Sequence, residues 1–390
     1  MRIMMFSHGY PPTISGVTLV VQKIARSMVQ RGHEVIVVTA SDRHLPYRAQ
    51  DQGVRLVRTL GIPNVFWTEG PIPFITPWTI RRLVEQFNPD IIHTHENAVI
   101  SWMLVRVRWK KRPILITSSY SLPRYATHYL HFGGLDDRFE KMLWSYVVGH
   151  LNCYEHVVFC THTHERDFIT HGLLPPTIVI SNGVNIQRYN PEKTLGEDVE
   201  RRYNLPARPR ILSVGRLMKD KKLDLLIQAM RVVCNECEAH LLVVGRGSER
   251  PRLKSLIKEL HLEPYIHLLG YVSEADLPAL YRASDLFAIP SIVEVQSIPA
   301  IQATVTGLPI VAANSAALPE LVRNGENGFL VEPLNANELG EAILRILHDP
   351  EIARQMGRIS LEIGCPHDER LTFQAYEDFY RGLVDKSNHR

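Results

Sequence analysis

The fold class follows from the stretch RIMMFSHGYPPTISGVTLVVQKIARSMVQRGHEVIVVTA, residues 2–40. A short apolar run, RIMMFS, leads into HGYPPTISG, a segment rich in residues that break regular structure. From Val17 the apolar residues recur at helical spacing, and Gly32 lies where a glycine commonly ends a helix. EVIVVTA is then a continuous apolar run, typical of a strand buried on both faces of a parallel sheet. The stretch predicts a strand–helix–strand unit.

The same alternation continues along the chain. TPWTIRRLVEQFNPDIIHTH and AVISWMLVRVRWKKRPILITS each predict a helix followed by a strand. Residues 186–209 are polar and contain prolines, which is typical of a linker, and a second alternating series follows them. We therefore predict an α/β protein with two doubly wound, Rossmann-like domains, residues 1–190 and 205–369, and a ligand-binding cleft between them.

The composition excludes several classes of protein. Of the 390 residues, 45% are apolar and 22% are charged, as in ordinary globular proteins. A net charge of +3 is too small to indicate a nucleic-acid partner. The apolar run after Arg2 is too short for a signal peptide, and no run is long enough to span a membrane. We expect a cytoplasmic protein, and the sequence does not indicate an oligomeric state.

The cysteines are scattered, apart from one C-x-x-C formed by Cys234 and Cys237 within a helical pattern. A zinc or redox site would be expected to have further ligands or a recognisable setting, and no second pair is present. A structural pair is therefore favoured over a zinc or redox site.

Two cations follow an apolar strand in SVGRLMKDKK. Gly215 and Arg216 lie just after the strand, at the carboxyl edge where doubly wound folds bind ligands, and Lys221 comes five residues after Arg216. Together the two cations could neutralise a diphosphate leaving group. The alternative is a solvated basic loop.

The stretch EVQSIPAIQ, Glu294 to Gln302, predicts a second ligand-binding element. Ser297 is a favourable N-cap for a helix over Ile298–Thr306 that ends at Gly307. The first N–H groups of such a helix bind anions or sugar hydroxyls, and the Glu294 carboxylate accepts hydrogen bonds from hydroxyls. Gln302, one turn further, either reaches the ligand or is an ordinary polar helix residue.

Two other strand-to-helix turns contain glycine, one at Gly16 and one at Gly245. Neither has the G-x-G-x-x-G spacing, so a dinucleotide site is not indicated. His93 and His95 end a predicted strand and point to the same face, and they either line the cleft, serve the fold or bind a metal. A metal site needs a third ligand that the sequence does not supply, and the chain contains no Asp-x-Asp.

The stretch WMLVRVRWKKR, Trp102 to Arg112, combines cations with two tryptophans on a predicted helix. Basic charge beside interfacial aromatic residues is typical of helices that lie on a membrane surface. The alternative is a solvated helix end, because cations favour helix C-termini.

Taken together and in order, these motifs resemble one family. The chain is similar to the retaining glycosyltransferases of the large GT-B group that includes sucrose synthase and bacterial phosphatidylinositol mannosyltransferases. The similar segments cover nearly the whole chain: YPPTISGV, RGHEVIVVTA, PDIIHTH, VISNGVNIQRYNP, SVGRL, LLVVGRG, SDLFAIPS and GLPIVAANSAALPELVRNGENGFLVEP. Any one segment is weak evidence, whereas the ordered set is specific.

The resemblance implies roles on the donor side. Arg216 and Lys221 would hold the donor diphosphate, and Glu294 would contact the donor sugar as part of the catalytic site. Gln302 stands where the family usually has Glu and would bind the ribose hydroxyls. The remaining donor-binding positions implied are Gly16, Gly215, Gly245, Gln296, Ser297 and Ile298. The family uses no metal or other cofactor, and its C-terminal helix, here about residues 370–390, returns to the N-terminal domain.

On the acceptor side the chain departs from the family pattern. Ser119 occupies the place where many relatives have a His near the reacting sugar, so that either His95 compensates for it or the acceptor is held differently. YSLPRYATHYL, from Tyr120 onward, resembles the acceptor-side loop of glycolipid synthases. Ala316 and Ala317 replace a common Gly-Gly, and Val295-Gln296-Ser297 replaces Gly-Phe-Gly.

These features predict a retaining hexosyltransferase that uses a UDP- or GDP-sugar. The favoured acceptor is a membrane lipid such as diacylglycerol. The protein would lie at the inner face of the plasma membrane and contact the membrane surface through Trp102–Arg112. A soluble or polysaccharide-precursor acceptor is one alternative. A 2-epimerase, or a relative that binds sugar nucleotides without catalysis, is another.

Overall fold

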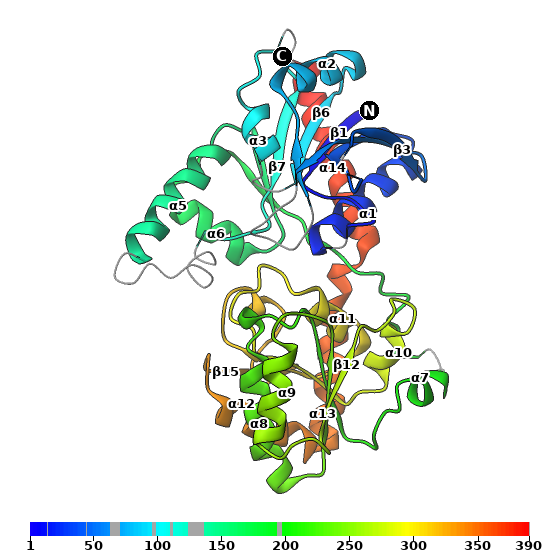
Figure 1. Ribbon diagram of the computed structural model, residues 1–390, viewed down its shortest axis with the longest axis vertical. Coiled ribbons are helices and arrows are strands. Elements are labelled where there is room, and N and C mark those ends of the chain that lie inside the picture. The colour runs from blue at the N-terminus through cyan, green and yellow to red at the C-terminus, as the bar shows by residue number, and fades with distance from the viewer. Residues whose placement is uncertain are drawn as a thin grey trace. The chain divides into compact units, whose positions relative to one another are not determined.

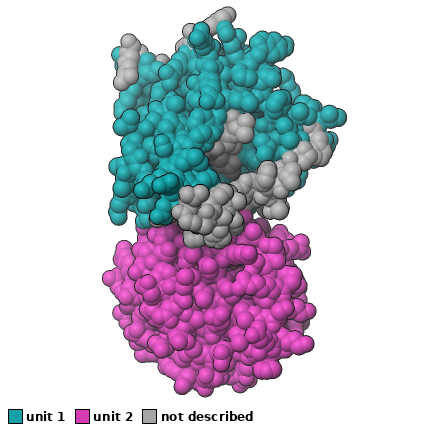
Figure 2. Space-filling view, turned by 60° about the vertical axis from the view of Figure 1, so that its left-hand side comes forward, with its two compact units in different colours: residues 1–181, 372–390 teal, residues 182–371 magenta. Residues whose placement is uncertain are grey.

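The computed structural model describes residues 1–13, 15–43, 45–62, 71–95, 99–109, 112–123, 136–192 and 197–389 (Figure 1). The chain forms two compact units (Figure 2). Unit 1 comprises Met1–Ser181 together with Thr372–Arg390, and unit 2 comprises Asn182–Leu371. The segment expected to be a linker, 186–209, belongs to unit 2 and contains helix α7 (Glu197–Arg202).

Unit 1 is built on one sheet, to which nine strands of the described chain contribute in the order β3-β4-β2-β1-β6-β7-β8-β9, with β5 paired to β4. β3 and β5 are antiparallel to β4, and the other pairs are parallel. The strands are β1 (Arg2–Ser7), β2 (Glu34–Ala40), β3 (Tyr47–Asp51), β4 (Val54–Ile62), β5 (Ile72–Phe74), β6 (Ile91–His95), β7 (Ile114–Ser118), β8 (His156–Phe159) and β9 (Thr177–Val179).

Helices cover both faces of this sheet. They are α1 (Gly16–Gln30), α2 (Pro77–Phe87), α3 (Val99–Leu104), α5 (Asp136–Leu151), α6 (His162–Thr170) and α14 (Glu369–Asn388). Along β1, Ile3 and Met5 pack in one core cluster with α1 and α14, whereas Met4 and Phe6 pack in a second cluster with α2 and α3. This alternation is the period of two expected for a strand buried on both faces.

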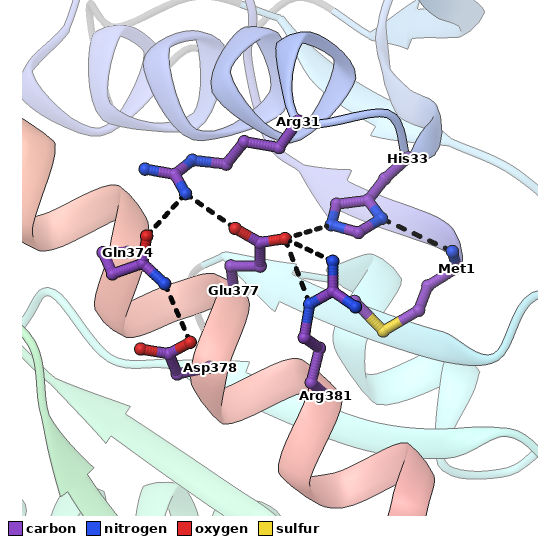
Figure 3. Close-up of polar contacts among 7 residues, drawn as sticks. All are labelled: Met1, Arg31, His33, Gln374, Glu377, Asp378 and Arg381. Carbon is purple, nitrogen blue, oxygen red and sulfur yellow. Dashed lines mark hydrogen bonds and ion pairs between the residues drawn. The ribbon is translucent and has the colours of Figure 1, made fainter.

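Helix α14 is fastened to the rest of unit 1 through Glu377 (Figure 3). Its carboxylate accepts a hydrogen bond from Arg31 at 2.6 Å and lies 3.1 Å from His33 Nε2, and both of these residues follow α1. Within α14 itself, the carboxylate also accepts from Arg381 at 2.7 Å. These contacts, the Arg381 bonds first, lower the pKa of Glu377 to about 2. The Tyr380 hydroxyl, on the same helix, lies 2.7 Å from His93 Nδ1.

Unit 2 has a six-stranded parallel sheet in the order β12-β11-β10-β13-β14-β15. The strands are β10 (Arg210–Val214), β11 (His240–Val244), β12 (Ile266–Gly270), β13 (Leu286–Ile289), β14 (Ile310–Ala313) and β15 (Gly328–Val331). Counted within the unit, this is the 3-2-1-4-5-6 order of the Rossmann fold, in which ligands bind at the carboxyl ends of the two central strands. Those strands are β10 and β13.

The helices of unit 2 again lie on both sheet faces and bury two apolar clusters. Besides α7 they are α8 (Leu223–Glu236), α9 (Arg250–Glu259), α10 (Leu277–Arg282), α11 (Ile298–Thr306), α12 (Ala336–Leu347) and α13 (Pro350–Gly364). Short 3₁₀ turns are η2 (Lys219–Lys221), η3 (Leu318–Glu320) and η4 (Cys365–His367). The prediction for α11 is confirmed, including its Ser297 N-cap and its Gly307 C-cap with φ of 78°.

The predicted helix over Trp102–Arg112 is wrong. Helix α3 ends at Leu104, the described residues that follow form a turn and irregular chain, and residues 110–111 lie outside the described part. The reason is the pattern from Val105 to Trp109, in which apolar and cationic residues alternate. Because the alternation has a period of two residues, the side chains of Val105, Val107 and Trp109 face the core, while the arginines between them are exposed.

Cys234 and Cys237 are free, half-buried thiols that pack against a core cluster of unit 2. Burial raises the pKa of both thiols, which makes them less reactive. The described residues contain no group of three or more side chains placed to hold a metal ion. None of the helices in the described ranges is long and apolar enough to cross a membrane.

Candidate active site

A small cavity of about 20 Å³ lies at the carboxyl ends of β10 and β13 in unit 2. Gly215 and Arg216, which directly follow β10, line it together with Lys221 of η2 and Glu294 from the loop after β13. Gly215 and Glu294 are 79 positions apart in the chain, and they line one cavity because parallel strands present their carboxyl ends at one edge of the sheet. The structure thus brings together the two cations and the carboxylate that the sequence singled out.

Lys221 and Glu294 form an ion pair, in which Lys221 Nζ donates to Glu294 Oε1 at 2.6 Å. Glu294 is only 7% exposed, whereas the Lys221 side chain keeps 19% of its surface exposed. The backbone carbonyl of Glu294 accepts from the Ala317 N–H at 3.1 Å, which fixes the loop that carries the carboxylate. The arrangement offers a cation for a phosphate and an acceptor for hydroxyls side by side.

Helix α11 starts at Ile298, four residues beyond Glu294. The Ser297 hydroxyl accepts from the Ala300 N–H at 3.3 Å, and Pro299 occupies the first turn. The positive end of the helix dipole lies at this terminus, next to the loop with Glu294, and the backbone of Ile298 is part of it. Gln296 uses its side-chain oxygen to accept from the Asn182 N–H at 2.8 Å.

Gln302 lies one turn inside α11 and is 9% exposed. Its Oε1 is 3.0 Å from the hydroxyl of Tyr281, a fully buried residue of α10, and the carbonyl of Pro299 lies 3.0 Å from the same hydroxyl. One hydroxyl carries only one proton, so the two acceptors compete for it. Tyr281, which the sequence interpretation missed, therefore determines how Gln302 presents its amide.

The two glycines at the strand ends differ. A Cβ at Gly245 would lie 1.8 Å from the Gly215 carbonyl oxygen, and its φ is +137°. A Cβ at Gly215 would meet nothing within 4 Å. Gly245 is thus required by the close approach of two backbones, whereas Gly215 leaves space at the cavity.

Ala316, noted only as a substitution for a common Gly, has a φ of +50°. This left-handed conformation costs an alanine roughly 1–2 kcal/mol, and it accounts for glycine being favourable there. The next residue, Ala317, holds the Glu294 loop through the N–H bond described above. The strain therefore lies beside the candidate site.

In unit 1, the predicted acceptor-side residues cluster at the carboxyl ends of β6 and β7. His93 is fully buried and hydrogen-bonded to Tyr380 and, at 2.8 Å, to Ser118, so it serves the fold. His95 Nδ1 lies 3.1 Å from the Tyr120 hydroxyl. Its Nε2 is buried and has no hydrogen-bond partner in the described part of the chain.

Burial lowers the pKa of His95 to about 3 and raises that of Tyr120 well above its ordinary value. Both side chains are therefore neutral near pH 7, and His95 does not act there as an imidazolium. Ser119 is buried, and its hydroxyl donates to the Ser121 carbonyl at 3.5 Å. Most of the loop that continues from Tyr120, residues 124–135, lies outside the described residues.

Gly16 is the first residue of α1, where Ser15 and Thr18 form a capping box. The Ser15 hydroxyl accepts from the Thr18 N–H at 3.2 Å, and the Ser15 N–H donates to the Thr18 hydroxyl at 2.8 Å. A Cβ at Gly16 would meet nothing within 4 Å, so the fold itself does not require glycine there.

The two halves of the chain match two family descriptions. Residues 14–188 match Glycosyltransferase Family 4, and residues 197–362 match Glycosyl transferases group 1. The two doubly wound units have the GT-B fold. The chain belongs to family 4, also called group 1, whose members are retaining hexosyltransferases that use nucleotide sugars. The resemblance expected from the sequence and the GT-B fold are thus confirmed.

Three known proteins illustrate the similarity. The α-monoglucosyldiacylglycerol synthase of Acholeplasma laidlawii is 24% identical, over 100% of this chain and 99% of its own. The structure of sucrose-phosphate synthase from Thermosynechococcus elongatus superimposes with a TM-score of 0.81 at 22% identity, over 99% of both chains. An Anabaena protein in complex with UDP-glucose has a TM-score of 0.78 at 20% identity, over 98% of this chain and 100% of its own.

Proposed function

We propose that this glycosyltransferase moves a hexose from a UDP- or GDP-sugar to the hydroxyl of a membrane lipid such as diacylglycerol, with retention. The observation that carries the proposal is the Lys221–Glu294 pair at the carboxyl ends of β10 and β13, with Arg216 lining the same cavity. A cation pair for a diphosphate and a carboxylate for sugar hydroxyls are the groups that this reaction requires.

In this mechanism Arg216 and Lys221 stabilise the charge that develops on the leaving diphosphate. Glu294 and the N-terminus of α11 hold the donor sugar, which positions its reacting carbon. Gln302 binds the ribose, away from the bond that breaks. The amide of Gln302 can still accept one hydrogen bond from a ribose hydroxyl and donate another. Glutamine in place of the family's usual glutamate therefore weakens binding of the nucleotide sugar but does not abolish catalysis.

Unit 1 would supply the acceptor side and one contact to the donor. Gly16 leaves space at the start of α1, so that the phosphate of the donor can approach the helix N-terminus. The unpartnered Nε2 of His95 is suited to a hydrogen bond with a hydroxyl, and Tyr120 sets the orientation of that imidazole. Ser119 lies at the same edge of the sheet and takes the place of the more common histidine.

A lipid acceptor is supported by the full-length similarity to a glucosyldiacylglycerol synthase. Exposed cations, Arg106, Arg108 and Arg112, also follow α3 in unit 1, and Arg106 stacks over Trp102. Trp102 stacks in turn on Tyr146 of α5, which is 56% exposed. Cations beside aromatic side chains suit an anionic lipid surface, so the protein would act at the cytoplasmic face of a membrane.

The test is to incubate the protein with labelled UDP-, GDP- and ADP-sugars and diacylglycerol micelles, and to follow label into the organic phase. Label there, lost in Lys221→Ala but kept in Lys219→Ala, would support the proposal, because Lys219 is exposed on the same turn and does not line the cavity. Release of nucleoside diphosphate without lipid labelling would show that the donor is cleaved with transfer of its sugar to water, and would favour a soluble acceptor over a lipid. A free altered donor would identify an epimerase, and binding without any turnover a non-catalytic relative.

A further inference from the structure

Asp220 is an acidic residue beside the candidate site that the proposed mechanism does not use. It is the middle residue of η2, directly before Lys221, and only 6% of it is exposed. Its Oδ2 lies 3.7 Å from Lys221 Nζ. Its Oδ1 is buried and has no hydrogen-bond partner within the described residues.

One ammonium group therefore lies between two carboxylates. Lys221 is 2.6 Å from Glu294 but 3.7 Å from Asp220, so Glu294 is the favoured partner and Asp220 is only loosely paired. A buried carboxylate is costly unless a cation and hydrogen bonds compensate it. The chain nevertheless keeps such a carboxylate next to the ion pair.

The fold gives no reason for this acid. Turn η2 has no side-chain cap hydrogen bond, and Asp220 Oδ1 has no hydrogen-bond partner, backbone or side chain, among the described residues. The contact that ties the turn to the loop after β13 is made by the Asp220 backbone carbonyl, which accepts from the Ser291 hydroxyl at 3.3 Å. Any residue at position 220 would provide that carbonyl.

We propose that Asp220 is a positioning residue for Lys221, and this rests on the proposed function. When a donor binds, Glu294 turns to the sugar hydroxyls and loosens its hold on the ammonium. Asp220 is then the nearest remaining carboxylate, and the flexible lysine stem can close the 3.7 Å separation. Held by Asp220, the ammonium stays directed at the diphosphate instead of following Glu294.

The experiment compares Asp220→Asn with Asp220→Glu, each with Lys221 present and in Lys221→Ala. Asp224→Asn is the matched control, because Asp224 lies four residues further on and pairs with Arg252 at 3.1 Å outside the cavity. Binding is measured by calorimetry with UDP, GDP and ADP. Turnover is measured as kcat and KM for whichever nucleotide sugar the protein uses, and Tm reports the fold.

With Lys221 present, Asp220→Asn should lower kcat roughly tenfold and weaken binding of the preferred diphosphate about fivefold, with Tm unchanged. In Lys221→Ala the same substitution should have no further effect, because Asp220 acts through the ammonium. Asp220→Glu should recover part of the activity, and Asp224→Asn should resemble the wild type.

Equal effects of Asp220→Asn in both backgrounds would overturn the proposal. So would tighter diphosphate binding in both, which is the result expected of a carboxylate that merely repels phosphate. A wild-type protein that binds none of the three diphosphates and turns over no donor would instead refute the proposed function, and the role of Asp220 with it.

Discussion

Replacing Gly245 with alanine should destabilise unit 2, whereas the same change at Gly215 should not. The new Cβ at position 245 would lie 1.8 Å from the Gly215 carbonyl oxygen and 2.9 Å from its carbonyl carbon. Both atoms belong to backbone at the end of the central strand β10, so neither can rotate away as a side chain would. Relief requires the ends of β10 and β11 to separate.

The cost has two parts. Overpacking of a well-filled interior typically costs about 1–3 kcal/mol, and a non-glycine residue forced to positive φ costs about 1–2 kcal/mol more. The sum, about 2–5 kcal/mol, is a large part of the 5–15 kcal/mol that typically stabilises a domain. In a domain of 150–250 residues, each kcal/mol lowers Tm by roughly 2–4 °C, so Gly245→Ala should lower Tm by at least about 4 °C.

Gly215→Ala is the matched control, since its Cβ would meet no atom within 4 Å. Calorimetric unfolding should therefore leave its Tm within about 2 °C of the wild type. The added methyl group would, however, face the cavity shared with Arg216 and Lys221. We expect binding of the preferred nucleoside diphosphate to weaken roughly tenfold, or about 1.4 kcal/mol.

A Gly245→Ala protein with unchanged Tm would refute the steric argument. A Gly215→Ala protein that bound nucleotide as well as the wild type would show that the added methyl group does not obstruct the cavity. Equal loss of stability in both variants would mean that the difference between the two backbone environments has been misjudged.

Three further predictions concern single side chains. Lys221→Ala should reduce kcat by about 10²–10³ in steady-state assays while Lys219→Ala does not, because it removes a cation from the leaving diphosphate; near-normal turnover would contradict this. Gln302→Glu should change the Kd of the donor, measured by calorimetry, more than kcat, and an equal Kd would count against a ribose contact. Glu377, with its pKa lowered to about 2 from 4.5, stabilises the fold above pH 4.5 and loses this effect as the pH falls toward 2. Glu377→Gln should therefore flatten the dependence of Tm on pH between about 5 and 2, and an unchanged slope would argue against the contacts of Figure 3.

Local signals in the sequence predicted some elements fully. The bounds of α11 follow from Ser297 and Gly307, because caps act within a few residues of the helix end. The position of Gly215 and Arg216 at the carboxyl edge of the sheet was likewise predictable, because an apolar strand directly precedes them and a turn follows. The same local reasoning failed after Leu104, where a period of two was interpreted as a helix although it turns Val105 and Val107 inward.

Other features depend on contacts between distant residues. The ion pair of Lys221 with Glu294 joins residues 73 positions apart, and no pattern within either segment indicates its 2.6 Å distance. The approach of Tyr281 to Gln302 depends on how α10 packs beside α11. The left-handed φ of Ala316 was not predictable either, since alanine is not a residue that signals it. These three features therefore became visible only in the folded structure, where the segments that form them are packed together.

The order in which the chain is synthesised differs from the order in which its units can be completed. Unit 1 begins first but needs Tyr376 and Tyr380 of α14, which are 1% and 0% exposed in its core. Unit 2 has all its residues once Leu371 has left the ribosome. We therefore expect unit 2 to finish folding before unit 1, although it starts later. A nascent chain that stops at Leu371 would leave unit 1 with an uncovered apolar face, the surface that a chaperone would bind.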